Sequence, residues 1–212
     1  MKKVFTAIFA AALMLIGTEA FAQLSFGAGY INAADKSVVK ENVTNSTTTG
    51  TVDLNGVYAG ASYNIYLGFV DGLGFAPGAF VTAMFGKKNE VNYSDIALNV
   101  PVHVTYAYEL TPDFKVFGFG GPALSVGLLK KASFTENGTT HTTDYYNKDY
   151  DTTFERINVL LGLGCGFEVA ELVQVTIGAD FGLLPQYKAE NSFGSMKYSR
   201  PYQLKVGVGY RF

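Results

Sequence analysis

The sequence predicts an all-β protein: an eight-stranded antiparallel up-and-down transmembrane β-barrel preceded by a cleaved signal peptide. Three observations support this fold class. The chain begins with an export pattern, several later segments alternate apolar and polar residues, and long connections alternate with short ones. Charged residues make up 16% of the chain and aromatic residues 15%. A soluble surface usually needs more charge, about 25%.

Residues 1–22 are predicted to form the signal peptide. A basic start, Met1-Lys2-Lys3, is followed by an apolar run that ends at Ile16, and then by the small-residue signature Ala20-Phe21-Ala22. The apolar run is shorter than the roughly 20 residues that a membrane-spanning helix needs. We therefore expect cleavage at the site marked by Ala20 and Ala22, and one outer-membrane β-barrel domain at residues 23–212.

The clearest strand is the last one, from Tyr202 to Phe212. Every even-numbered residue in it is apolar, and the odd-numbered residues are Gln, Lys, Gly, Gly and Arg. A period of two gives one apolar face and one polar or small face. The same design recurs at residues 96–108, 157–167 and 173–183. Less regular segments at 24–34, 51–67, 73–86 and 115–129 complete a set of eight, and Gly120-Gly121-Pro122 predicts a β-bulge in the last of these.

The lengths of the connections agree with a membrane barrel. The connections at 35–50, 87–93, 130–153 and 188–200 are longer than those at 68–72, 111–114 and 170–172. Outer-membrane barrels have long loops outside and short turns in the periplasm. We therefore expect both termini to be periplasmic.

The second face of the strands favours lipid outside over a soluble, lipocalin-like barrel. A soluble barrel would need a charged outer surface, whereas this face is mostly Gly, Ala, Ser, Thr, Asn and Gln, which fit a narrow interior. The apolar face, including Cys165, is then expected to contact lipid. The net charge of −2 offers no basic surface for nucleic acid. The aromatic girdle at the outer membrane interface is expected to include Tyr30, Phe85, Tyr93, Phe154, Tyr187 and Tyr202.

Two segments resemble a known family. The end of the chain, Val206-Gly207-Val208-Gly209-Tyr210-Arg211-Phe212, is similar to the C-terminal strand by which outer-membrane barrels are recognised for insertion. Residues 96–104 resemble the "LxIPxxxxY" strand of the outer-membrane protein β-barrel domain family, which includes small OmpA/OmpX-type and PorT-like barrels. The resemblance implies a Gram-negative outer-membrane location and an insertion signal at Tyr210 and Phe212. Its implied partners are outer-membrane lipid, the barrel-insertion machinery and periplasmic chaperones, and it specifies no activity.

The alternation also predicts a polar network inside the barrel. Buried charges need partners, and the strand spacing places Asp180 near Lys205 and Glu168 near Arg211. The side chains expected in this network are Glu109, Arg156, Glu168, Asp180, Lys205, Arg211 and His103. Such a network favours a filled lumen, and an ion path is the alternative.

The sequence offers no convincing catalytic, cofactor or metal site. His103 and Thr105 resemble the His-x-Ser pair of barrel enzymes that deacylate lipid A, but the hydroxyl belongs to Thr, the pair points inward, and no acidic partner for the histidine is evident. We therefore expect a hydrogen-bonded lumen histidine. Two histidines and one cysteine in the whole chain do not make a metal-ligand cluster.

These observations favour a monomeric, non-enzymatic outer-membrane barrel that serves envelope structure or surface interaction through its long outer loops. The loop at 35–50 is rich in Thr and the loop at 130–153 in Thr and Tyr, which suits either hydrated surface loops or contact with an unidentified surface ligand or host partner. A small channel or secretion-system component is the alternative function, followed by a lipid-modifying enzyme.

Overall fold

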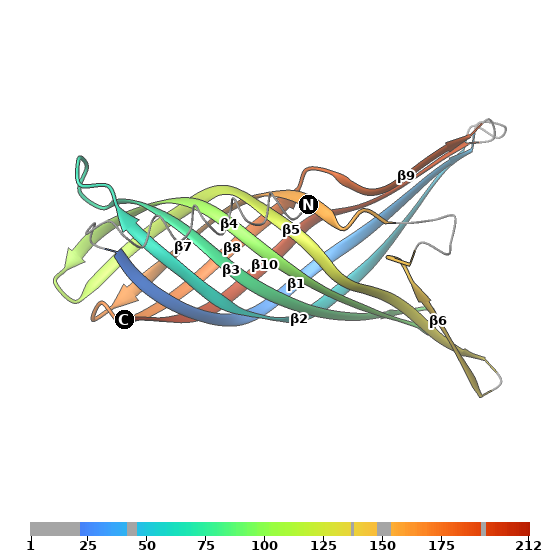
Figure 1. Cartoon of the computed structure of the whole chain (residues 1–212), viewed down its shortest axis with the longest axis horizontal. Coiled ribbons are helices and arrows are strands. Elements are labelled where there is room, and N and C mark those ends of the chain that lie inside the picture. The colour runs from blue at the N-terminus through green and yellow to red at the C-terminus, as the bar shows by residue number, and fades with distance from the viewer. Residues whose placement is uncertain (1–21, 42–45, 137, 148–153, 192–193) are drawn as a thin grey trace.

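Eight strands close into a barrel, as predicted. The computed structural model describes residues 22–41, 46–136, 138–147, 154–191 and 194–212. The ring runs β1-β2-β3-β4-β5-β7-β8-β10 and returns to β1, with antiparallel pairing throughout (Figure 1). The strands of the ring are β1 (Ala22–Glu41), β2 (Ser46–Tyr66), β3 (Leu73–Lys88), β4 (Val91–Thr111), β5 (Phe114–Glu136), β7 (Ile157–Val169), β8 (Val173–Gly182) and β10 (Gly194–Arg211).

The predicted signal peptide lies almost wholly outside the described residues. Ala20 falls among the residues that are not described, whereas Ala22 begins β1. In the described part of the chain, no helix is long and apolar enough to cross a membrane.

The side chains of the ring are arranged inside out relative to a soluble protein. The outward-facing Leu161, Ile177 and Leu204 are 46%, 57% and 49% exposed, whereas the inward-facing Thr82 and Gln203 are buried. Exposed aliphatic side chains around a whole barrel are stable only against lipid. The free thiol of Cys165 is also exposed, on the same face as Leu161 and Leu163.

Two sheets extend from one end of the ring and diverge (Figure 1). The first flange is a four-stranded sheet made of β9 (Pro185–Asn191) and the outer parts of β10, β1 and β2, at residues 194–199, 36–41 and 46–51. The second flange is made of the outer part of β5 and of β6 (Thr139–Asp144), which pairs with it. Much of the sequence predicted as outer loop is therefore strand.

The predicted loop at 87–93 is a tight turn. Residues Asn89 and Glu90 connect β3 to β4 with φ angles of 48° and 64°. Positive φ at both central positions is typical of a two-residue hairpin turn.

The predicted bulge at residues 120–122 is wrong. The β4–β5 register is the same on both sides of it, from Val104–Gly120 to Pro101–Ala123. Gly121 instead allows a close approach of the two backbones, because a Cβ there would overlap the Val102 carbonyl oxygen. The register shifts that shape the outer end of the barrel lie elsewhere, at Leu128 in β5 and between Ser199 and Tyr202 in β10.

Candidate functional site: the barrel lumen

The half of the lumen nearer the flanges, called the outer half, is filled by side chains. Ile31, Leu54, Met84 and Leu160 are almost completely buried there, and Thr82 donates a hydrogen bond to the Ala97 carbonyl at 3.3 Å. An eight-stranded barrel is just wide enough for such filling. This packed layer supports the polar groups above it, toward the flanges.

Four buried charged residues form a cluster at the outer end of this layer. Asp35 accepts hydrogen bonds from Arg200 Nε at 2.6 Å, from Arg200 Nη2 at 3.0 Å and from Lys130 Nζ at 2.6 Å. Asp95 accepts from Arg200 Nη2 at 3.0 Å and lies 3.3 Å from Lys130 Nζ. Tyr198 donates to Asp35 Oδ2 at 2.9 Å. The two acids and two bases balance, so this four-charge cluster is neutral.

Bulges bring both cations of the cluster inside. In β5 the extra residue is Leu128, because Ile96 pairs with Leu129 while Ala97 pairs with Gly127. In β10, Arg200 and Pro201 together lie opposite Asp35. Each extra residue reverses the inward–outward alternation, which turns Lys130 and Arg200 toward the lumen. Proline suits a bulge because it has no N–H to donate to the ladder.

A further register shift brings a polar side chain of the first flange to the four-charge cluster. Tyr198 pairs with Tyr187 and Ser199 with Pro185, so Gln186 is the extra residue in β9. Its buried side chain accepts a hydrogen bond from Lys130 Nζ at 3.0 Å.

Aromatic rings cover the four-charge cluster. The ring of Phe154 lies 4.7 Å from Tyr145, 5.4 Å from Tyr187 and 4.8 Å from Tyr198, centroid to centroid. Lys130 Nζ lies 4.8 Å from the centroid of the Tyr198 ring, within cation–π range. The expectation that Phe154 belongs to the lipid girdle is wrong: residues 154–156 fold over the barrel mouth, where the Glu155 N–H donates to the Gln186 carbonyl at 2.7 Å.

The four-charge cluster lies beyond the apolar belt. On β1 the aromatic side chains of the outward face end at Tyr30, and Asp35 pairs with Val52, past the exposed Asp53. Burial alone would raise the pKa of Asp35, but the charges of Arg200 and Lys130 hold it well below its usual range. Burial, followed by the charge of Asp35, raises the pKa of the Tyr198 hydroxyl far above its usual value. Asp35 is therefore ionised and Tyr198 is neutral at physiological pH.

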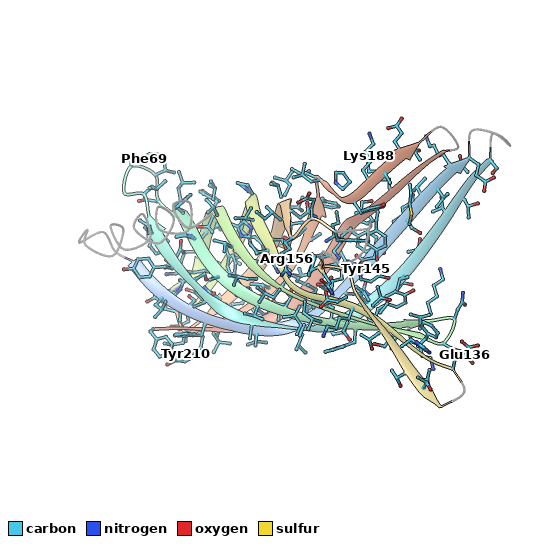
Figure 2. All side chains as sticks on the ribbon, turned by 45° about the vertical axis from the view of Figure 1, so that its right-hand side comes forward. Phe69, Glu136, Tyr145, Arg156, Lys188 and Tyr210 are labelled. Carbon is cyan, nitrogen blue, oxygen red and sulfur yellow. The ribbon has the colours of Figure 1, made fainter. Side chains whose placement is uncertain are left out.

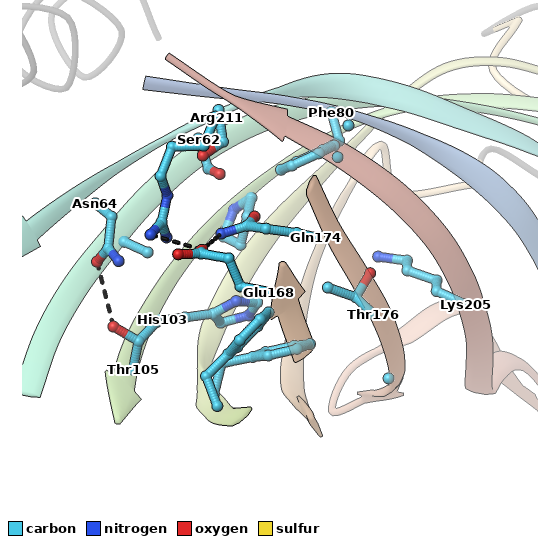
Figure 3. Close-up of a pocket in the computed structure, with 18 of the residues that line it drawn as sticks. Ser62, Asn64, Phe80, His103, Thr105, Glu168, Gln174, Thr176, Lys205 and Arg211 are labelled. Atoms are coloured by element: carbon cyan, nitrogen blue, oxygen red, sulfur yellow. Dashed lines mark hydrogen bonds and ion pairs between the residues drawn. The ribbon is translucent and has the colours of Figure 1, made fainter. Parts of the chain in front are cut away.

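The half of the lumen far from the flanges is different, because it holds a cavity of about 180 Å³ (Figure 3). Its walls combine aromatic rings with ion pairs. Arg211 Nη1 lies 2.6 Å from Glu168 Oε2, which also accepts a hydrogen bond from Gln174 at 2.7 Å. Lys205 contacts Asp180. Both predicted pairs therefore form, and both line this cavity.

Two residues of the predicted network lie outside the lumen. Glu109 is exposed at the rim opposite the flanges, 3.8 Å from Lys115, because β4 continues past the end of the cavity. Arg156 is also exposed and lies over the ring of Tyr146, 4.6 Å from its centroid. Strand β7 begins only at residue 157, so alternation does not determine the direction of Arg156. Figure 2 shows Arg156 near Tyr145.

The lumen histidine has no catalytic arrangement around it. His103 stacks on Phe119 with the ring centroids 5.1 Å apart, and Thr105 donates to Asn64 Oδ1 at 3.2 Å. The histidine lines the cavity as predicted, but its expected hydrogen bond is not found: Nε2 is buried without a partner. Among the described residues, no group of three His, Cys, Asp or Glu could hold a metal ion.

Comparison with known proteins agrees with this architecture. Residues 8–212 match the family model of the outer membrane protein beta-barrel domain. The chain belongs to this family. Its members' fold and the lipid-facing exterior place the protein in the bacterial outer membrane. No protein of curated function matches the chain.

Several solved structures are similar to this member of the family. The attachment invasion locus protein Ail of Yersinia pestis is 15% identical, with 92% of this chain and 100% of Ail covered and a TM-score of 0.40. Neisserial surface protein A is 16% identical, with 88% and 97% covered and a TM-score of 0.41. The outer membrane protein OprG of Pseudomonas aeruginosa is 12% identical, with 91% and 97% covered and a TM-score of 0.46.

Proposed function

We propose that the protein is a non-enzymatic, monomeric outer-membrane barrel whose lumen is sealed at the outer end and whose two flanges form its contact surface outside the cell. Both termini are periplasmic in this proposal. Support comes from the short turns at residues 67–72, 112–113 and 170–172 and from the C-terminus, which lie at the end opposite the flanges, whereas the two-residue turn at Asn89 and Glu90 lies at the flange end (Figure 1). Its partners are the surrounding outer-membrane lipid and, during assembly, periplasmic chaperones and the insertion machinery, which would recognise the exposed Tyr210 and Phe212.

The sealed lumen rests on the four-charge cluster and its aromatic cover. A conducting path would have to pass Asp35, Asp95, Lys130 and Arg200, which are all buried and bonded to one another. Moving ions through this layer would require separating charges that are costly to leave unpaired. Filling by Met84 and Leu160 directly below adds a second obstruction.

A small channel is the competing function, and the cavity in the periplasmic half favours it. That cavity supplies only half of a path, because its lining residues end at Asn99 and Ala123, below the four-charge cluster. The two functions therefore differ in whether ions pass through the outer half of the lumen when a voltage is applied across the membrane.

Single-channel recording in planar bilayers tests the proposal. The wild-type protein is expected to show no steady conductance. The variant Asp35→Ala, Arg200→Ala, Leu160→Ala removes one acid and one base from the outer half together with part of the filling below them, and is expected to produce openings. The matched variant Asp180→Ala, Lys205→Ala, Leu160→Ala removes the same charge types from the periplasmic half and should stay closed. Steady conductance of the wild type would overturn the sealed lumen.

A further inference from the structure

The first flange has two faces of different chemistry. Residues paired directly across an antiparallel ladder lie on the same face. Lys36 pairs with Thr51 and Ser199, and Lys40 pairs with Thr47 and Ser195. In the row between them, Val38 pairs with Lys197, which pairs with Lys188. One face of the flange therefore carries four exposed lysines among hydroxyl side chains, which we call the lysine face: Lys36, Lys40, Lys188 and Lys197.

The opposite face of the same sheet has no lysine in the described residues. Its rows are built from Ser37, Val39 and Thr48 on β1 and β2, and from Met196 and Tyr198 on β10. Sorting of all four lysines to one side of a two-sided sheet indicates that this side meets a partner of opposite charge.

The lysine face points the same way as the lipid-facing belt. Lys36 and Lys40 lie on the same face of β1 as Phe26 and Tyr30. All four have even numbers, and the β1–β2 ladder keeps one register from residue 22 to residue 41. The flange leans away from the barrel axis (Figure 1), and Lys188 lies on it well beyond the ring (Figure 2). Its outward face therefore leans over the membrane surface beside the barrel. Lys36 is six residues past Tyr30, about 20 Å along the strand.

The acidic residues on this face do not cancel the lysines. Asp53 lies at its base and Glu190 forms an ion pair with Lys188, N to O 3.4 Å. Lys197 and Lys188 are direct cross-strand neighbours, an arrangement that repulsion makes unfavourable unless an anion lies between them.

We propose that the lysine face binds the phosphate groups of anionic glycolipid headgroups in the outer leaflet around the barrel. Four ammonium groups and the neighbouring hydroxyls match phosphate as donors. Basic residues near a membrane surface each contribute about fivefold to the affinity for anionic lipid. The proposal rests on the flanges lying outside the cell, and it is independent of the sealed lumen, so the conductance test and the test below can fail separately.

Native mass spectrometry of the folded protein in detergent, titrated with lipid A that carries two phosphates, tests the proposal. The variant Lys40→Gln, Lys197→Gln is expected to bind roughly twentyfold more weakly, and Lys40→Arg, Lys197→Arg should bind like the wild type. The control Thr48→Glu, Ala189→Glu changes the net charge equally on the opposite face and should lose less than about threefold, because water and salt screen distant charges. The heat-dependent gel shift checks folding, and Lys36→Gln, Lys188→Gln provides a second test if the first variant does not fold.

Three results would overturn the proposal. The first is an equal loss of affinity in the lysine variant and in the opposite-face control. The second is unchanged binding of lipid A from which both phosphates have been removed. The third is stronger binding of heparin, a soluble sulfated polysaccharide, with the same dependence on Lys40 and Lys197, which would identify a soluble polyanion as the partner.

Discussion

The two halves of the lumen treat buried charge in different ways. At the outer end, Asp35 and Arg200 belong to a neutral cluster of four charges that is buried under aromatic rings. In the half far from the flanges, Glu168–Arg211 and Asp180–Lys205 are separate pairs along the wall of a cavity. The comparison teaches that the same residue types can seal a barrel or line an opening in it, depending on whether space remains beside them.

The largest expected difference between the halves is in stability. Asp35→Asn leaves Lys130 and Arg200 with only Asp95 as a buried counter-charge, and breaking a buried ion pair in this way costs about 3–5 kcal/mol. Asp180→Asn should cost at most about 2 kcal/mol, because Lys205 is partly exposed and can turn toward the cavity. Urea unfolding of both variants in lipid vesicles measures the two costs. Equal costs would show that the halves do not differ.

The next test of the difference between the two halves is how the free energy of unfolding depends on pH. The pKa of Asp35 is lowered in the folded state, so its stabilising contribution is complete above its unfolded pKa of about 3.9 and is lost as the pH falls below that value. We expect its contribution to the free energy of unfolding to be constant from pH 7 to about pH 4 and to decline at lower pH. Asp35→Asn should remove this decline, and a decline that persists in the variant would assign it to other groups.

A smaller effect is expected from Tyr198, which joins the aromatic cover to the four-charge cluster. Tyr198→Phe keeps the ring contact with Phe154 but removes the hydrogen bond to Asp35, which still has Lys130 and Arg200 as donors. The cost should be about 1–2 kcal/mol. In the double variant with Asp35→Asn it should nearly vanish, because the partner charge is gone. Additive costs in a double-mutant cycle would show that the hydroxyl acts independently of Asp35.

The sequence predicted the half of the lumen far from the flanges better than the half near them, and the reason is alternation. From Gln203 to Arg211 no residue interrupts the period of two, so the inward direction of Lys205 and its contact with Asp180 follow from parity alone. Four of the eight strands were predicted in the same way, and four less regular segments completed the ring.

The four-charge cluster escaped prediction because two bulges change the parity that the prediction used. Arg200 and Lys130 both stand beyond an extra residue, and both were assigned to loops. Two local signals mark these places. One is Pro201 inside an otherwise regular strand, and the other is the apolar pair Leu128–Leu129, where alternation would require one polar or small residue. Asp35 obeys parity and was missed because the predicted strand ended at Ala34, directly before it, whereas β1 continues to Glu41.

The smallest effect is expected where the chain leaves the barrel. Replacing residues 38–49 with a two-residue turn between Ser37 and Gly50, which pair directly, removes the end of the first flange but leaves Asp35, Arg200 and their bonds in place. Because the described side chains among those removed are mostly exposed, the free energy of unfolding should change by less than about 1 kcal/mol. The heat-dependent gel shift should persist while lipid A binding weakens through loss of Lys40. If the shortened protein failed to fold, the flange would be part of the barrel's stability rather than a surface added to it.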